Sequence, residues 1–109
     1  MKKNDKKLDN ALRIALTDVC ESLKQSHQGF EWLTHLVNYA DFPRSLTIVC
    51  VFDTNQHLND ADKASLLKVL KSELAAIKVQ VKDIAKQVRF DSEENCRLQH
   101  GGKWNKRLG

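Results

Sequence analysis

Residues 74–90 read LAAIKVQVKDIAKQVRF, and this stretch decides the fold. Apolar residues in and before it recur every three or four positions, the spacing of one helix face or of a coiled-coil seam. Val79 and Val81 also alternate with polar residues as in a strand, and no Gly or Pro separates the two patterns. The stretch therefore allows two readings. The residues at helical spacing are Leu67, Leu70, Leu74, Ile77, Val81, Ile84 and Val88.

We favour a helix that is followed by a strand. Val79, Val81 and residues 88–90 are β-branched or aromatic, types that helices disfavour. This reading predicts an extended element over residues 78–91, bent or bulged near residues 83–85. A single continuous helix would instead expose an apolar seam to a coiled-coil partner, so the chain would be half of a paired rod.

The rest of the chain predicts elements that suit a small sheet. Apolar residues at helical spacing predict a first helix over residues 5–26, with Asp5 as its N-cap. Aromatic and branched residues predict strands over residues 30–39 and 46–53, joined by a turn at residues 40–44 as an antiparallel hairpin. The second of these strands is apolar on both faces and is therefore expected at the centre of the sheet.

Two more helices complete the predicted order. Asn59 or Asp60 is expected to cap the second helix, whose core face holds Leu67, Leu70, Leu74 and Ile77 with Ala64 behind. Asp91, with Glu94 three residues later, predicts a short helix that ends near Gln99. The fold class is α+β, one small domain over residues 1–109 in the order α-β-β-α-β(-α), with helices packed on one face of the sheet. Residues 1–4 and 103–109 are expected to be flexible basic ends.

Composition narrows the class of protein. The 109 residues are 41% hydrophobic and 29% charged, values typical of a single globular domain rather than a disordered chain. No apolar run reaches the ~20 residues that span a bilayer, and no signal peptide is recognised, so a cytoplasmic protein without membrane contact is expected. The three cysteines form no close pair, which favours a reducing compartment over a disulfide framework.

Basic residues are the strongest functional signal. The net charge is +4, and Lys78, Lys82, Lys86 and Arg89 recur every three or four positions. With a basic C-terminal end they could grip phosphates, while Trp104 stacks on a base. The alternative is a solvated face that prevents edge-to-edge association. The residues of the C-terminal end are Lys103, Trp104, Lys106 and Arg107.

A second candidate site is polar. It follows the predicted central strand, where α/β sheets place ligands, and has no glycine to cradle a phosphate. The alternative is a loop that caps the next helix. Cys96 and His100 would share a helix face, but structural zinc needs four ligands, so we expect no metal, no cofactor and no catalytic residue. The members of this polar site are Asp53, Thr54, Asn55, His57, Asp91 and His100.

Several segments resemble a family of short bacterial proteins that carry the label Fis-family transcriptional regulator. They are residues 30–35 (FEWLTH), 51–55 (VFDTN), 90–96 (FDSEENC) and 100–105 (HGGKWN). The label implies DNA binding through a C-terminal helix-turn-helix. Here Gly101-Gly102 and a short basic tail predict no such unit, and the resemblance implies no catalytic residue.

The sequence thus predicts a non-enzymatic binding protein, with nucleic acid as the first candidate partner through the Lys-rich face. A protein–protein interaction or homodimerisation module is the alternative, through the apolar seam or an exposed edge around Phe30 and Trp32. A hydrolase that uses Asp53, Asp91 and His100 is the third hypothesis.

Overall fold

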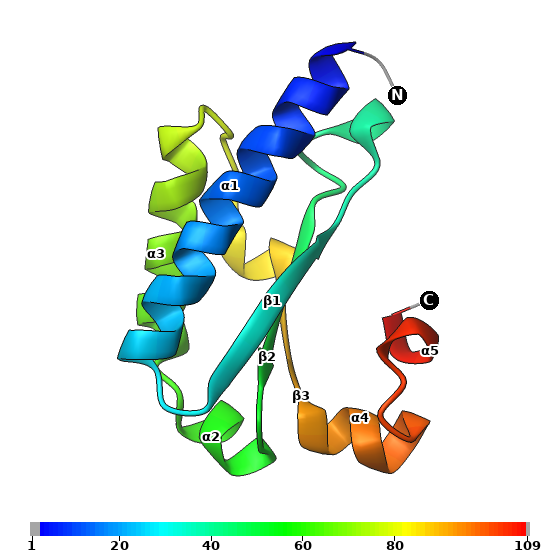
Figure 1. Cartoon of the computed structure of the whole chain (residues 1–109). Helices are drawn as coiled ribbons and strands as arrows, with labels where there is room; N and C mark the ends of the chain where they lie inside the picture. The colour runs from blue at the N-terminus through cyan, green and yellow to red at the C-terminus, as the bar shows by residue number, and fades with distance from the viewer. Residues whose placement is uncertain (1–2, 109) are drawn as a thin grey trace.

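A long amphipathic helix opens the computed structural model, which describes residues 3–108 (Figure 1). This helix, α1 (Lys3–Ser26), buries Leu12, Leu16, Val19 and Leu23 on one stripe, as its apolar spacing predicts. The stripe packs on one face of the sheet together with α3 (Lys63–Ala76). The prediction that the long helices cover one face is therefore confirmed.

The sheet has three strands in the order β1-β2-β3. Strands β1 (Phe30–Leu36) and β2 (Thr47–Phe52) pair antiparallel, so the hairpin is confirmed, and β2 is central and buried on both faces. A short 3₁₀ helix, η1 (Tyr39–Asp41), and a cis Phe42–Pro43 peptide bond lie in the connection between them.

A bulge in β1 sends two nearby aromatic residues to opposite faces of the sheet. Phe30 lies opposite Phe52, and Trp32 lies opposite Val51, with the register shift between them. Residues two apart in a regular strand point the same way, so the extra residue reverses that relation. Phe30 joins the main core and meets the Phe52 ring edge-on, while Trp32 is left for the second face.

Helix α3 ends at Ala76, inside the stretch that decides the fold. Strand β3 (Val88–Ser92) then pairs parallel with β2, which excludes the continuous helix. The extended element expected over residues 78–91 was too long, because regular pairing begins only at Val88. The expected bend is a 3₁₀ helix, η2 (Ile84–Gln87), and Val79 and Val81 are buried without being strand residues.

Two helices, rather than one, connect β2 to β3. Thr54 caps α2 (Asn55–Asp60), and Asp62 caps α3 by accepting a hydrogen bond from the Ser65 amide at 3.0 Å. The predicted caps Asn59 and Asp60 were wrong, because both lie inside α2. Two of the predicted core residues of α3, Leu70 and Leu74, are buried as expected. Leu66 is the third buried residue in place of Leu67, which is only partly buried like Ile77, and Ala64 is exposed.

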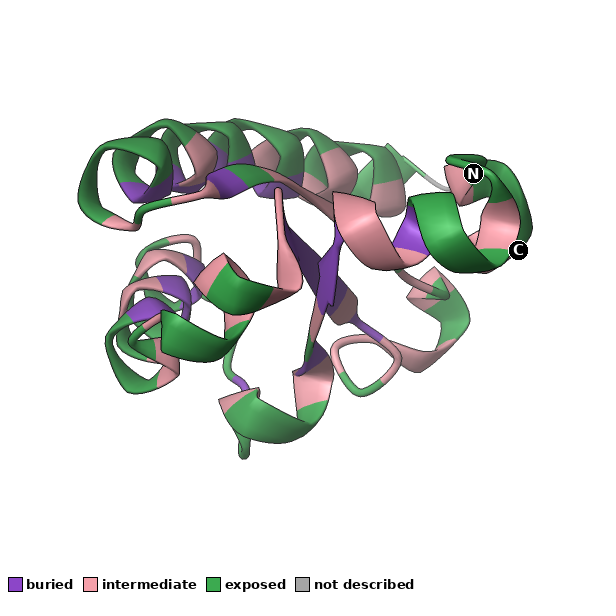
Figure 2. Cartoon of the chain, turned by 90° about the horizontal axis from the view of Figure 1, so that it is seen from below, coloured by how far each residue is buried: buried purple, intermediate pink, exposed green. Residues whose placement is uncertain are grey.

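Two further helices pack on the second face of the sheet. Helix α4 (Glu93–His100) follows β3 directly, and α5 (Trp104–Leu108) returns towards the strands (Figures 1 and 2). Ser92, not Asp91, is the N-cap of α4. The expectation that helices pack on one face only is therefore incomplete, and the sequence did not predict α5.

Parts of both ends that were predicted to be flexible are helical in the structure. Lys3 and Asn4 already belong to α1, and Trp104–Leu108 form α5. Residues 1, 2 and 109 lie outside the described part of the chain. Among residues 3–108, no helix combines the length and hydropathy needed to cross a bilayer.

Candidate functional site

Two of the three strands bring the predicted polar residues to one edge. Because β2 and β3 run parallel, their carboxyl ends meet, and the loop after β2 lies beside the start of α4. The amide of Asn55 donates to Glu94 Oε1 at 2.9 Å across this edge. The structure therefore gathers five of the six predicted polar residues at the strand ends, and His100 lies at the far end of α4.

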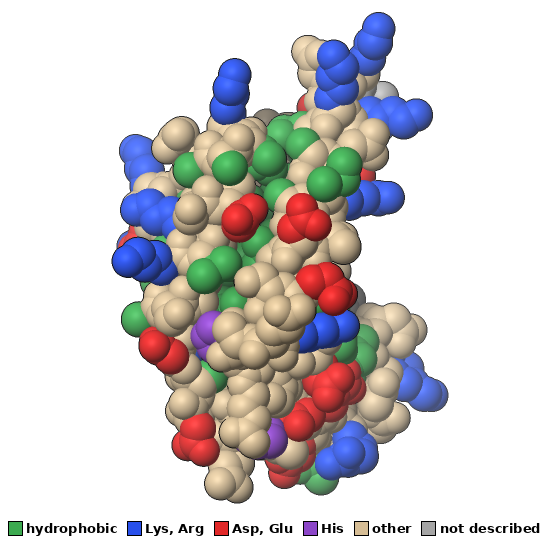
Figure 3. Space-filling view, turned by 60° about the vertical axis from the view of Figure 1, so that its left-hand side comes forward, with side chains coloured by type: hydrophobic (Ala, Val, Ile, Leu, Met, Phe, Trp, Pro, Cys, Tyr) green, Lys and Arg blue, Asp and Glu red, His purple; other side chains and the backbone are tan. Residues whose placement is uncertain are grey.

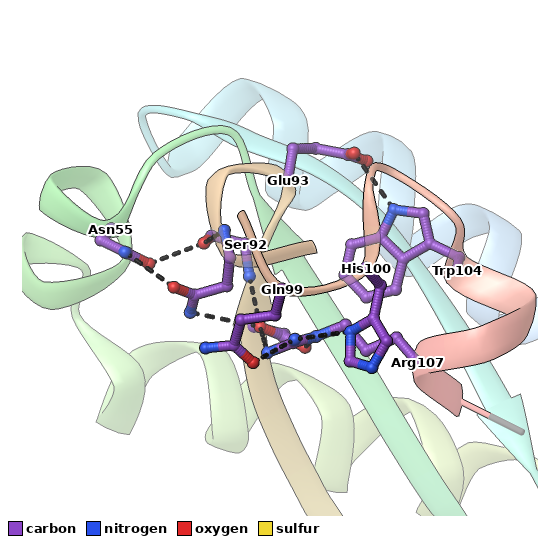
Figure 4. Close-up of polar contacts among 9 residues, drawn as sticks. Asn55, Ser92, Glu93, Gln99, His100, Trp104 and Arg107 are labelled. Carbon is purple, nitrogen blue, oxygen red and sulfur yellow. Dashed lines mark hydrogen bonds and ion pairs between the residues drawn. The ribbon is translucent and has the colours of Figure 1, made fainter. Parts of the chain in front are cut away.

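A chain of hydrogen bonds links the two loops (Figure 4). Ser92 donates from Oγ to Asn55 Oδ1 at 2.6 Å, and Asn55 Nδ2 donates to Asn95 Oδ1 at 2.8 Å. Ser92 Oγ in turn accepts the Asn95 amide, which caps α4. Ser92 is fully buried, so its hydroxyl needs these partners. This chain fixes α4 on the end of the parallel pair.

Asp91 holds the C-terminal helix through a two-pronged ion pair. Arg107 donates from Nε to Asp91 Oδ2 and from Nη2 to Oδ1, the latter at 2.9 Å. Arg107 Nη1 donates to Gln99 Oε1 at 2.7 Å and lies 3.3 Å from His100 Nδ1. Burial alone would raise the pKa of Asp91, but the hydrogen bonds from Arg107, the Ser92 amide and Asn95 outweigh it and lower that pKa.

Two indoles share one carboxylate next to this pair. Trp32 Nε1 donates to Glu93 Oε1 at 2.6 Å, and Trp104 Nε1 donates to Glu93 Oε2 at 3.1 Å. The two rings meet edge to face with centroids 4.9 Å apart. Trp104 is thus docked against β1 and is not free to stack on a base.

Asp53 and His57 form a separate pair at the end of β2. Asp53 Oδ1 lies 2.7 Å from His57 Nδ1 and also accepts the Thr54 amide. Burial tends to raise the pKa of Asp53, yet the hydrogen bonds from His57 and Thr54 lower it overall. Gly29 makes room for this pair: a Cβ there would lie 2.4 Å from His57 Nδ1 and 2.6 Å from Asp53 Oδ1.

The polar side chains at this edge are bonded to one another and stabilise the fold. Within residues 3–108, no buried side-chain nitrogen or oxygen lacks a partner, and no group of three or more His, Cys, Asp or Glu side chains is placed to hold a metal ion. A nearby pocket of about 310 Å³ is lined by His57, but neither Asp91 nor His100 lines it. The carboxylates of Asp53 and Asp91 are each committed to a partner of their own.

The predicted basic residues divide into two groups. Lys78, Lys82 and Lys86 are exposed on the segment between α3 and β3, and Arg89 is exposed on β3. Lys103, Trp104, Lys106 and Arg107 lie on or beside α5, which Figure 1 places well away from the end of α3. The single basic surface expected from the sequence stays a prediction, and Arg89 lies two residues before Asp91, which binds Arg107.

A groove of about 550 Å³ lies beside the first group. One wall comes from the turn before β2, with Pro43 and Arg44, and the other from the segment after α3, with Lys82. Gln87 Nε2 ties the walls together by donating to the carbonyls of Pro43 and Leu46 at 2.8 and 2.9 Å. We call this the basic groove; its lining residues are Pro43, Arg44, Gln80, Val81, Lys82 and Gln87.

Sequence reasoning missed Arg44 as a site residue. It stands nearly forty positions before Lys82, inside what reads as a turn, so no local spacing connects them. On the face drawn in Figure 3, lysines and arginines lie mainly at the upper end and along the edges.

No protein-family model, no curated protein and no solved structure matches this chain. The resemblance to the Fis-labelled family stays a prediction.

Proposed function

We propose that the protein is a non-enzymatic binding protein that takes single-stranded nucleic acid in the basic groove. The observation that carries the proposal is the convergence of Arg44 and Lys82, from distant segments, on one concave site without a carboxylate in its lining. Lys78 and Lys86 flank it on the same segment and are exposed. Two cations therefore line the groove, and two more stand near its lining residues in the sequence.

Charge supplies most of the affinity in this proposal. A polyanion releases condensed counterions when lysines and arginines replace them, and this term needs no particular base sequence. Arg44 already pairs with Asp41 at 3.0 Å, but their side chains are 86% and 46% exposed. An ion pair so exposed contributes little, so Arg44 can exchange Asp41 for a phosphate.

The shape of the groove favours a single strand. Proteins that read a duplex in its major groove insert a helix or a two-stranded ribbon there. The basic groove is concave, and its volume is that of a typical small-ligand pocket, enough for a nucleotide unit. Pro43 is partly exposed and gives an apolar surface for a base, and the exposed amide of Gln80 offers a donor and an acceptor to its edge.

A hydrolytic function is the weaker hypothesis. Asp53 is paired with His57, Asp91 with Arg107, and His100 lies against Arg107 rather than against either carboxylate. A general base needs a free lone pair within reach of a substrate proton. Asp91 accepts four hydrogen bonds, two of them from Arg107, and its lowered pKa makes it a weak base.

Charge reversal in the groove tests the proposal. The Arg44→Glu/Lys82→Glu variant should bind a fluorescent single-stranded oligonucleotide at least tenfold more weakly than the wild type in an anisotropy titration. The Lys103→Glu/Lys106→Glu variant changes the net charge equally, away from the groove, and should lose less than threefold. Equal losses in the two variants would reduce the interaction to bulk charge and refute the groove.

A further inference from the structure

The C-terminal helix is held by the rest of the chain rather than by its own backbone. Helix α5 has five residues, far fewer than the roughly 12–15 that a marginally stable isolated helix needs. The contacts described above come from two side chains, Trp104 and Arg107. They end on Trp32, Asp91, Glu93 and Gln99. We call residues 101–108 the tail and these four residues the tail receptor.

The tail is joined to α4 by a hinge that is not packed. Gly101 and Gly102 have φ of +60° and +81°, and a Cβ at either position would meet no atom within 4 Å. Glycine is free to leave such conformations for extended ones. Opening the hinge breaks the hydrogen bonds from the Gly101 and Gly102 amides to the Arg97 and Cys96 carbonyls, but it breaks no side-chain contact of the hinge.

An empty tail receptor has a much higher free energy than an occupied one. The Asp91 side chain is only 10% exposed, and Arg107 is its one charged partner among residues 3–108. A mostly buried carboxylate that loses its guanidinium keeps its desolvation penalty without compensation. Glu93 would lose one of its two indole donors at the same time. An opened receptor therefore favours an occupant with the same two groups, an indole and an arginine one turn apart.

The geometry points to exchange of the tail between two copies of this chain, with Trp104 and Arg107 of one copy in the tail receptor of the other. Exchange of an identical segment keeps the contacts of the closed form outside the hinge, so its free-energy cost is low. This inference is independent of the nucleic-acid proposal, because the tail receptor and the basic groove share no residue.

The short hinge restricts the arrangement of the two copies. The hinge and Lys103 together span at most about 10 Å when extended. The C-terminal ends of the α4 helices of the two copies must then lie close together. Leu98 on α4 is 72% exposed, on the helix whose Cys96 is buried. A second α4 next to it would cover that leucine.

A complementation experiment with two full-length variants tests the exchange. The Trp104→Ala/Arg107→Ala variant keeps the receptor but lacks a competent tail, and the Asp91→Asn/Glu93→Gln variant keeps the tail but has a weakened receptor. Light scattering after chromatography should give 12.5 kDa for each variant alone and about twice that mass for the equimolar mixture. A mixture that stays at the monomer mass, with both variants folded by circular dichroism, would overturn the inference.

Wild-type protein provides a second test if either variant fails to fold. Refolding from urea at high protein concentration should yield a dimer fraction that the Leu98→Glu variant lowers at least tenfold. That variant should leave the unfolding temperature of the monomer unchanged, because Leu98 is exposed there. Refolding to monomer alone at every concentration would equally rule out tail exchange.

Discussion

The amide of Val79 donates a hydrogen bond to the carbonyl of Leu74 at 2.9 Å, and this contact ends α3. With the bond from the Lys78 amide to the Ala75 carbonyl, it forms a Schellman motif. Lys78 occupies the left-handed position at φ 65°, where glycine is usual. Val79 and Leu74 are both buried, so the apolar contact that accompanies this motif is present too.

The Lys78→Gly variant should be more stable than the wild type. A side chain in the left-handed region costs about 1 kcal/mol, which glycine does not pay. Urea denaturation should show a gain of about that size. The Lys82→Gly variant is the control, because Lys82 has no positive φ, and it should be neutral or slightly less stable. A loss of stability in Lys78→Gly would contradict the assigned helix end.

The Gly29→Ala variant should be strongly destabilised. The new methyl group would meet His57 and Asp53 at contact distances no real Cβ shows, and the φ of +83° is unfavourable besides. We expect a loss of roughly 3 kcal/mol from the clash and the strained backbone together.

The Gly102→Ala variant is the matched control for that loss. Its φ of +81° is nearly the same, but the space around it is open, so only the backbone term of about 1 kcal/mol applies. Thermal unfolding of the two variants separates the cost of the clash from the cost of the strained backbone. Equal losses would show that the Asp53–His57 pair does not pack on Gly29.

Asp91 should make the stability of the protein depend on acid. Its pKa is lowered from 3.8 in the folded state, so its contribution is complete above the unfolded value and is lost as the pH falls through the folded value. The Asp91→Asn variant should therefore lose about 3 kcal/mol at pH 7, since it breaks a mostly buried pair.

The difference between wild type and Asp91→Asn should shrink below about pH 4, because the Asp91 carboxyl of the unfolded chain takes up a proton there before that of the folded protein. Urea denaturation from pH 7 to pH 2.5 measures it. The Asp18→Asn variant alters an exposed carboxylate on α1 and should change the stability little at any pH. A difference that stays constant down to pH 2.5 would contradict the role given to the ion pair.

The fold was largely predictable because burial patterns are local. The apolar stripe of α1 and the doubly apolar strand β2 gave correct elements within a few residues. The end of α3 was harder, because its motif uses Lys78 instead of glycine, and the apolar spacing runs on past it. The bulge between Phe30 and Trp32 left no signal in the sequence, although it decides which face each ring occupies.

The candidate sites were less predictable because they depend on contacts between distant segments. The polar residues after β2 and at β3 could be placed at one edge only once the strands were known to be parallel. Arg107 and Trp104 were predicted to bind phosphate and a base, but Asp91 and Glu93 hold them instead. No spacing in the sequence links the positions 91 and 107.

The salt dependence of oligonucleotide binding tests the basic groove most directly. Three or four phosphate contacts predict that the logarithm of the association constant falls with the logarithm of salt concentration at a slope of about −2 to −3 for a single strand. The Arg44→Glu/Lys82→Glu variant should reduce that slope by about 1.4, the share of two contacts, and the Lys103→Glu/Lys106→Glu variant should leave it unchanged. A slope near zero for the wild type, or the same slope in all three proteins, would contradict the account.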